Sequence, residues 1–280
     1  MTRIITSLSE ISESYDALFC DLWGCVHDGL APFAEAVAAL QAFRARGGTV
    51  MLVTNAPRPH APVRRQLDRL GVPSDAYDGI ATSGDSARAA MLRGAVGEKV
   101  YFIGQPHDQD FFAPLELIEN PVKISQVPLE QAEGMVCCGP FDPLADPEEM
   151  RAQFLQAKTR GLKLLCANPD IVVDRGETRE WCAGALAKLY TEMGGESLYF
   201  GKPHPPIYDL ARRRLQALGK DIPDSRILCV GDGILTDIDG AMGEDLDSLF
   251  ITGGLAARET QTADQPDPKA LMAYLTREMR

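Results

Sequence analysis

The chain has 280 residues, of which 45% are hydrophobic and 24% charged, so it can bury one large core or two smaller ones. Its formal net charge of −12 argues against nucleic acid or an anionic membrane as its main partner. The N-terminal stretch lacks the apolar run of a signal peptide, and no run approaches the roughly 18 apolar residues of a spanning helix. We therefore expect a cytoplasmic protein.

Short β-rich runs alternate with helical patterns along the chain, which is typical of a parallel α/β sheet. Ser7 and Glu10 have the spacing of a capping box, which predicts a short N-terminal helix. Further elements are predicted as strands over 17–22, 49–55, 226–233 and 247–254, and as helices over 34–48, 62–71, 237–245 and 267–279.

A long middle stretch has its own α/β rhythm. Strands are predicted over 99–104, 122–125, 134–139 and 162–168, and helices over 86–97, 107–115, 147–161 and 181–195. This is too much structure for a loop, so we predict a second domain inserted into the first. The predicted bounds are 1–82 and 198–280 for the core domain and 83–197 for the inserted one.

Three predicted strands end in polar residues. The first delivers Asp21, the second ends in Thr54 and Asn55, and the strand over 226–233 delivers Asp232. Open α/β sheets bind their ligands just beyond the carboxyl ends of parallel strands. Such residues also begin turns and cap helices, but three endings of this kind together indicate a site.

Carboxylates near these strand ends predict a magnesium site. The motif GDGILTDIDGA supplies Asp232 and Asp237, and Asp21 would join them from a neighbouring strand. An all-oxygen set of this kind suits Mg²⁺. Lys202, between a predicted strand and a predicted helix, can act as a point charge against phosphate.

The seven cysteines show no spacing of a zinc ribbon or a redox pair. Most lie in apolar runs, where a reduced thiol acts as a small hydrophobic group. Cys25 differs from the others because it lies in the loop that follows Asp21.

The order of these residues, an Asp, a Thr, a Lys and then a Gly-Asp acidic loop, resembles the haloacid dehalogenase superfamily of phosphotransferases. The insertion, with Asn-Pro-Asp at 168–170 and YFGKPHP before the acidic loop, resembles class IIA, the NagD-like sugar and nucleotide phosphatases. The resemblance covers essentially the whole chain. It implies a Rossmann-like core with a parallel sheet and an inserted α/β cap domain.

The resemblance also implies roles for single residues. Asp21 would be the nucleophile that forms an aspartyl-phosphate. Its carboxylate, the backbone carbonyl of Trp23 and Asp232 would hold Mg²⁺, with Asp237 as a further acidic ligand or a neighbour of the ligands.

The phosphate and the rest of the substrate would be bound by other residues. Thr54 would donate a hydrogen bond to the phosphoryl oxygens and Lys202 would neutralise charge, while the cap would exclude water and select the leaving group. Asn55, Asn168 and Asp170 complete the predicted substrate-binding set. An Asn-Pro-Asp turn is equally a structural device.

Position 23 departs from the family pattern, because a second Asp that transfers protons usually stands where this chain has Trp23. Loss of such a group typically costs roughly 10²–10⁴-fold in rate. Another group or water could take over, the candidates being His27, Asp28, His60 and His204. A leaving group that needs no acid, or a protein that binds phosphate without turnover, would also explain Trp23.

These observations together predict an Mg²⁺-dependent phosphatase acting on a small phosphorylated metabolite through an aspartyl-phosphate intermediate. The alternative is a catalytically impaired protein that binds such a ligand. Neither nucleic acid nor membrane is an expected partner. A homodimer formed through the cap is left open.

Overall fold

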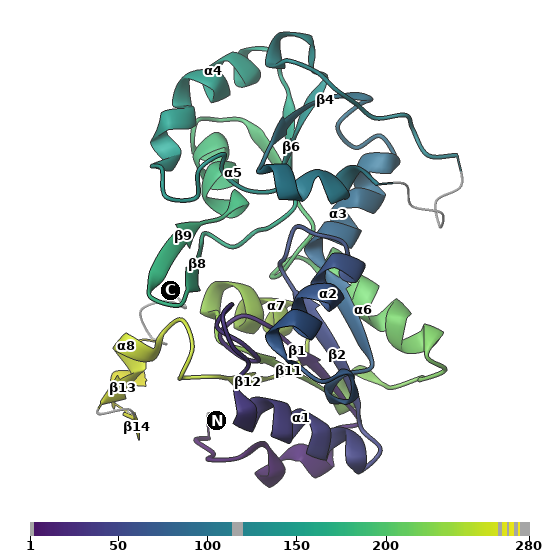
Figure 1. Cartoon of the computed structure of the whole chain (residues 1–280), viewed down its shortest axis with the longest axis vertical. Coiled ribbons are helices and arrows are strands. Elements are labelled where there is room, and N and C mark those ends of the chain that lie inside the picture. The colour runs from purple at the N-terminus through teal and green to yellow at the C-terminus, as the bar shows by residue number, and fades with distance from the viewer. Residues whose placement is uncertain (1–2, 114–119, 263–264, 268, 272–273, 275–280) are drawn as a thin grey trace. The chain divides into compact units, whose positions relative to one another are not determined.

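The computed structural model describes residues 3–113, 120–262, 265–267, 269–271 and 274. They divide into two units (Figure 1). The first comprises Met1–Thr54, Arg64–Ala81 and Tyr208–Arg280, and the second comprises Asn55–Val63 and Thr82–Ile207. Unlike the domain bounds predicted from the sequence, this division gives Asn55–Val63 and residues 198–207 to the second unit. The assignment of a core and a cap domain remains a prediction.

The first unit is built on a five-stranded sheet in the order β12-β11-β1-β2-β3. Its strands are β1 (Ala17–Cys20), β2 (Thr49–Thr54), β3 (Gly79–Thr82), β11 (Ile227–Gly231) and β12 (Asp247–Phe250). The pairs β1·β2, β1·β11 and β11·β12 are parallel. Every residue of β1, β2 and β11 is buried, as expected of parallel strands covered on both faces.

The second unit contains another five-stranded sheet, in the order β10-β7-β6-β4-β5, and its four strand pairs are all parallel. A separate antiparallel hairpin joins β8 to β9. The strands are β4 (Lys99–Ile103), β5 (Ser125–Gln126), β6 (Gly134–Cys137), β7 (Lys163–Cys166), β8 (Val172–Arg175), β9 (Thr178–Trp181) and β10 (Glu196–Tyr199). The hydrophobic core includes Phe154 and Tyr190, whose rings are 5.2 Å apart.

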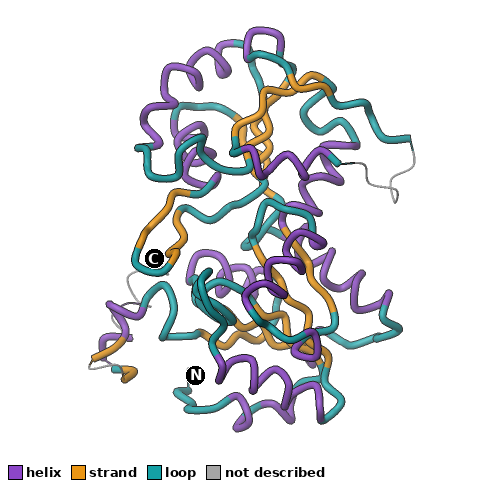
Figure 2. Tube along the Cα trace, in the orientation of Figure 1, coloured by secondary structure: helices purple, strands orange, loops and turns teal. Residues whose placement is uncertain are grey.

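Helices connect most of these strands (Figure 2). The α-helices are α1 (Ala34–Ala45), α2 (His60–Leu70), α3 (Ser83–Leu92), α4 (Arg151–Thr159), α5 (Ala183–Glu192), α6 (Pro205–Ala217), α7 (Asp239–Gly243) and α8 (Ala257–Thr260). A π-helical turn (Ile234–Ile238) precedes α7, and the strands β13 (Gln261–Thr262) and β14 (Gln265–Pro266) follow α8.

Short 3₁₀ helices complete the described structure: Leu8–Glu10, Ser12–Ser14, Ser74–Ala76, Pro106–Phe112, Leu129–Gln131, Pro147–Met150 and Asp224–Arg226. The predicted capping box at the first of them is confirmed, because the Ser7 side chain accepts from Ser9 N–H and the Glu10 carboxylate accepts from Ser7 N–H.

The predicted α/β fold with parallel sheets is confirmed. The prediction for 122–125 was largely wrong, since only Ser125 and Gln126 form a strand. The short strand β3 and the hairpin β8·β9 were not predicted, because four-residue runs of mixed polarity give little periodic signal. Most of the helix predicted over 267–279 lies outside the described residues.

Within the described residues, no helix combines the length and the apolar character that crossing a membrane requires.

Candidate active site

Three neighbouring strands of the first unit end in polar residues at one edge of the sheet. Asp21 follows β1, Thr54 is the last residue of β2, and Asp232 follows β11. Cys20 is in register with both Val230 and Leu52, so all three residues lie within two positions of this level. The three strand ends therefore lie at nearly the same level of the sheet, and their role as a site stays a prediction.

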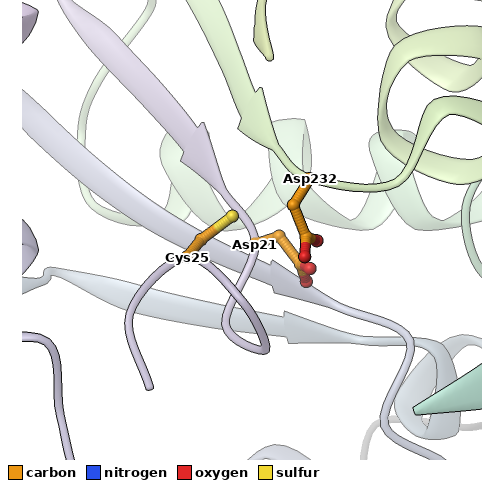
Figure 3. Close-up of side chains that lie close together, drawn as sticks. All are labelled: Asp21, Cys25 and Asp232. Carbon is orange, nitrogen blue, oxygen red and sulfur yellow. The ribbon is translucent and has the colours of Figure 1, made fainter. Parts of the chain in front are cut away.

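The carboxylates of Asp21 and Asp232 form a buried cluster with the thiol of Cys25. One ligand atom from each residue lies within 4.8 Å of the other two (Figure 3). Asp21 is 9% exposed, and Cys25 and Asp232 are each 7% exposed. Two buried carboxylates this close repel each other unless a proton or a cation compensates their charge.

Close backbone approaches fix the position of the Asp232 carboxylate. Oδ2 of Asp232 accepts a 2.6 Å hydrogen bond from the backbone N–H of Leu255. A Cβ at Gly24 would lie 1.9 Å from the same oxygen, and one at Gly254 would lie 2.1 Å from it. A side chain at either position would therefore displace this carboxylate, and Gly24 also has a φ of +73°, which favours glycine.

Asp237 lies on the same acidic loop but outside the cluster of ligand atoms. Its Oδ2 accepts from the backbone N–H of Gly233 at 3.0 Å, while its own N–H donates to the carbonyl of Gly233 at 2.8 Å. These bonds hold the π-helical turn against the end of β11. Whether Asp237 is a metal ligand stays a prediction.

Trp23 is held by the loop that follows Asp21. Its ring contacts that of His27 edge to face, with centroids 5.0 Å apart and planes at 73°. A Cβ at Gly29 would lie 2.4 Å from Cη2 and Cζ3 of the indole. The backbone N–H of Gly24 donates to the carbonyl of His27, and that of Gly29 donates to its Nδ1. The indole is thus fixed within this loop by His27 and Gly29.

Two residues of this loop are candidates for the missing proton-transfer role. Oδ1 of Asp28 accepts from the backbone N–H groups of Ala31 and Leu30, both at 2.8 Å, and these bonds lower the pKa of Asp28. Asp28 is therefore ionised at neutral pH and holds the turn, which makes it a poor proton donor. His27 is 1% exposed, and its Nδ1 accepts from Gly29.

The second unit gathers Asn55, Asp170 and Lys202. Asn55 Oδ1 accepts from the backbone N–H of Lys202 at 2.7 Å, while Asn55 Nδ2 donates to the Lys202 carbonyl at 3.1 Å and to Asp170 Oδ1 at 2.8 Å. A Cβ at Gly201 would lie 2.4 Å from Asn55 Oδ1, so a side chain there would displace the Asn55 amide. Asn55 thus holds the backbone of Lys202 through two hydrogen bonds. The residue Lys202 is 3% exposed.

Asn168 stabilises the turn that carries Asp170, because its Oδ1 accepts from the backbone N–H of Asp170 at 3.0 Å. This is the structural use of an Asn-Pro-Asp turn that the sequence left open. Substrate binding by Asn55, Asn168 and Asp170 remains a prediction.

The other two candidate histidines also belong to the second unit. His60 Nδ1 lies 2.8 Å from Oδ2 of Asp85, a buried carboxylate that also pairs with Arg88. The ring of His204 stacks on Tyr199, with centroids 4.8 Å apart, and burial lowers the pKa of His204.

Cys25 was singled out in the sequence only for its place in the loop. Its proximity to both carboxylates was missed, because the turn over 22–26 that brings it back needs the bonds from Val26 and His27 N–H to the Leu22 carbonyl. Burial, and then the charges of Asp232 and Asp21, raise the pKa of the Cys25 thiol well above its ordinary value. In the absence of a cation the thiol is therefore protonated.

Comparison with known proteins places this geometry in a family. A family model described as haloacid dehalogenase-like hydrolase matches residues 18–117, and a second, described as HAD-hydrolase-like, matches residues 199–277. The first match contains Asp21 and Thr54, and the second contains Lys202 and Asp232.

Several individual proteins are similar over most of their length. A crystal structure of a hydrolase of the haloacid dehalogenase-like family from Brucella suis 1330 is 41% identical, with a TM-score of 0.85 over 95% of this chain and 96% of that one. The 5'-nucleotidase YutF of Bacillus subtilis (strain 168) is 25% identical over 94% of this chain and 97% of its own length.

A crystal structure of a glycerol phosphate phosphatase from Mycobacterium tuberculosis, in complex with magnesium, is 27% identical, with a TM-score of 0.65 over 92% of this chain and 74% of that one. The family resemblance read from the motifs is therefore confirmed by two family models and by a relative of 41% identity. With its nucleophile position, threonine, lysine and acidic loop in the family's order, the chain belongs to the haloacid dehalogenase-like hydrolases.

Proposed function

We propose that this hydrolase is a phosphatase that hydrolyses a small phosphorylated metabolite through a covalent intermediate on Asp21, with Mg²⁺ as its cofactor. The observation that carries the proposal is the buried pair of carboxylates, Asp21 and Asp232, at the ends of adjacent parallel strands. The activities named for the relatives, 5'-nucleotidase and glycerol phosphate phosphatase, both release phosphate from a phosphate ester, which supports the same reaction class here.

The residues present fit a divalent cation. Asp21 and Asp232 offer carboxylate oxygens, the donors that Mg²⁺ prefers, and their closeness and burial favour a cation between them. The relative's structure with magnesium supports the choice of metal. The carbonyl of Trp23 and the carboxylate of Asp237 are the further ligands we propose. When bound, the metal supplies the positive charge that allows an anionic substrate to approach an anionic nucleophile.

The chain's own residues carry the two chemical steps. A carboxylate oxygen of Asp21 attacks phosphorus, the bond from phosphorus to the ester oxygen breaks, and that oxygen leaves with the electron pair. Water then attacks the aspartyl-phosphate, the bond from phosphorus to the Asp21 oxygen breaks, and the carboxylate is restored. The proton lost by the attacking water compensates the one taken up by the leaving group.

Thr54 and Lys202 complete the proposed mechanism. Thr54, at the end of β2, donates a hydrogen bond to the phosphoryl oxygens, and Lys202 neutralises their charge. Asn55 positions Lys202 through its two bonds to the lysine's backbone. The second unit acts as the cap that excludes water and selects the leaving group.

One observation favours a second candidate function. Trp23 occupies the position of the usual proton-transfer group, and its indole has no proton to give at neutral pH. The chain could therefore bind a phosphorylated ligand without efficient turnover. Tight binding of an aryl phosphate or of inorganic phosphate with no release of product would identify this function.

The test is phosphate release with and without Mg²⁺ from a panel of sugar phosphates, nucleotides, pyridoxal phosphate and aryl phosphates. We expect turnover that requires the metal and is lost in Asp21→Asn. A matched control is Asp245→Asn, since Asp245 is exposed and its φ of +57° suits asparagine equally well. Absence of turnover by the unmodified chain on every ester would refute the proposed phosphatase.

A further inference from the structure

The thiol of Cys25 has no part in the chemistry proposed above, yet it faces the same two carboxylates. Its sulfur, one oxygen of Asp21 and one of Asp232 lie within 4.8 Å of one another (Figure 3). Among the described residues, this is the one group of three histidine, cysteine or acidic side chains arranged closely enough to hold a metal ion. All three side chains are at least nine-tenths buried.

The sulfur of Cys25 also differs from three other buried cysteines in its bonding. Cys20, Cys137 and Cys166 each donate a hydrogen bond to a backbone carbonyl close in sequence. Within the described part of the chain, no such bond is found for Cys25. A polar atom that is buried, without a hydrogen-bond partner and directed toward two carboxylates is the second observation that points to a ligand.

Of these three donor atoms, Mg²⁺ would bind the two oxygens but not the sulfur. Mg²⁺ binds oxygen and binds thiols poorly, whereas Zn²⁺ and related cations bind both thiolate sulfur and carboxylate oxygen. In a tetrahedral zinc site, bonds of about 2.0 Å to oxygen and 2.3 Å to sulfur place the donor atoms about 3.3–3.5 Å apart. The observed separations, within 4.8 Å, exceed these values by at most about 1.5 Å.

We propose that Asp21, Cys25 and Asp232 form a site for a thiophilic divalent cation of the Zn²⁺ type, which shares both carboxylates with the oxygen site proposed for Mg²⁺. On binding, the bond from sulfur to hydrogen breaks, the proton passes to solvent, and a bond from sulfur to the metal forms. The cation then compensates most of the negative charge of the two carboxylates and the thiolate. The neutral thiol stays outside the coordination of Mg²⁺.

The site has a consequence for activity that rests on the proposed function. If Asp21 is the nucleophile, a cation that also holds Cys25 fixes an oxygen of Asp21 and occupies the place of Mg²⁺. Zn²⁺ is then an inhibitor that competes with Mg²⁺. The binding site itself needs no catalytic activity, so it can be measured separately.

The test uses Co²⁺, which takes zinc sites and gives a sulfur-to-cobalt charge-transfer absorption when a thiolate binds it. The full chain, freed of metal with a chelator, is titrated with Co²⁺. We expect this band in the unmodified chain, its displacement by Zn²⁺, and its loss only at Mg²⁺ concentrations far above that of Co²⁺. In Cys25→Ser the band is lost and the affinity for Co²⁺ falls by at least about tenfold.

Cys138→Ser is the matched control, because Cys138 is also a buried free thiol but belongs to the second unit. It should keep the band. Lack of the band in the unmodified chain refutes the site without any variant, as does a band that survives in Cys25→Ser. A band in a chain that hydrolyses no phosphate ester would leave the site standing and refute the proposed phosphatase, so the two failures are distinct.

Discussion

The indole of Trp23 packs edge to face on the imidazole of His27, with ring centroids 5.0 Å apart, two residues beyond the candidate nucleophile Asp21. Gly29 closes the other side, leaving no room for a side chain of its own. The packing of the loop therefore holds the Trp23 indole in place. If position 23 corresponds to the family's proton-transfer Asp, the leaving oxygen of a phosphate ester has no proton donor on this side chain.

We expect the unmodified chain to hydrolyse aryl or acyl phosphates far faster than alkyl phosphates, because their leaving groups depart without protonation. Trp23→Asp should raise the rate on alkyl phosphates by about 10²-fold or more, because a carboxyl at this position supplies the general acid that the family pattern has there. The measurement is kcat across esters of graded leaving-group pKa.

Trp23→Phe is the control for this series, because it keeps an apolar ring and should keep the steep dependence on leaving-group pKa. A flat dependence in the unmodified chain would mean that some other residue already donates the proton. His60 and His204 would then be the first candidates to replace.

Gly29 allows a prediction with a closely matched control. Gly29 and Gly71 have φ values of +85° and +84°, but a Cβ at Gly71 would meet nothing within 4 Å. Both alanine variants should lose about 1 kcal/mol of stability from backbone strain. Gly29→Ala should lose about 1–3 kcal/mol more, because its methyl group clashes with the indole.

The free energies of unfolding in urea measure this difference. In a Trp181→Phe background, fluorescence reports Trp23 alone, since the chain has two tryptophans. Its emission should shift in Gly29→Ala and not in Gly71→Ala. Equal stabilities of the two alanine variants would show that the loop accommodates the new methyl group beside the indole without a loss of stability.

The fold and the position of the site could be predicted from the sequence because the strongest signals are local. Runs such as 17–20 and 49–54 are apolar throughout, which marks buried parallel strands, and their polar endings follow directly. Adjacent parallel strands then bring Asp21, Thr54 and Asp232 to one edge without further information.

Contacts that depend on loop conformation could not be predicted. Cys25 reaches the carboxylates only because the loop folds back on Leu22, and Trp23 is fixed by His27 and Gly29 through bonds between non-adjacent residues. Asn55 reaches Lys202 across 147 positions of sequence. Such contacts cannot be predicted from periodicity or composition, since the contacts arise from tertiary structure.

Asn55 should prove to be a positioning residue for Lys202. Asn55→Ala leaves the buried N–H and carbonyl of Lys202 without the partners they have now, and we expect a loss of about 2–3 kcal/mol in the free energy of unfolding. Asn168→Ala, which removes the bond to the backbone N–H of Asp170 at a less buried position, should cost less. If Lys202 acts on the phosphoryl group, kcat should also fall in Asn55→Ala.

The two variants are compared by urea unfolding and by steady-state kinetics on the best substrate of the panel. Asn55→Ala should lower kcat even at temperatures where it is fully folded. Stability equal to that of the unmodified chain would show that Lys202 is held by other contacts.

Asp28 gives a prediction for acid pH. The backbone N–H groups of Ala31 and Leu30 lower its pKa below the ordinary value of 3.8, so its carboxylate stabilises the folded loop. This contribution is fully present above the unfolded pKa and is lost as the pH falls through the folded one. At neutral pH, Asp28→Asn should therefore be less stable than the unmodified chain. On acidification, its free energy of unfolding should fall by less than that of the unmodified chain. Urea unfolding at neutral pH and below 3.8 measures both values, and parallel losses in the two proteins would contradict the assignment of Asp28 as the charged group that holds this turn.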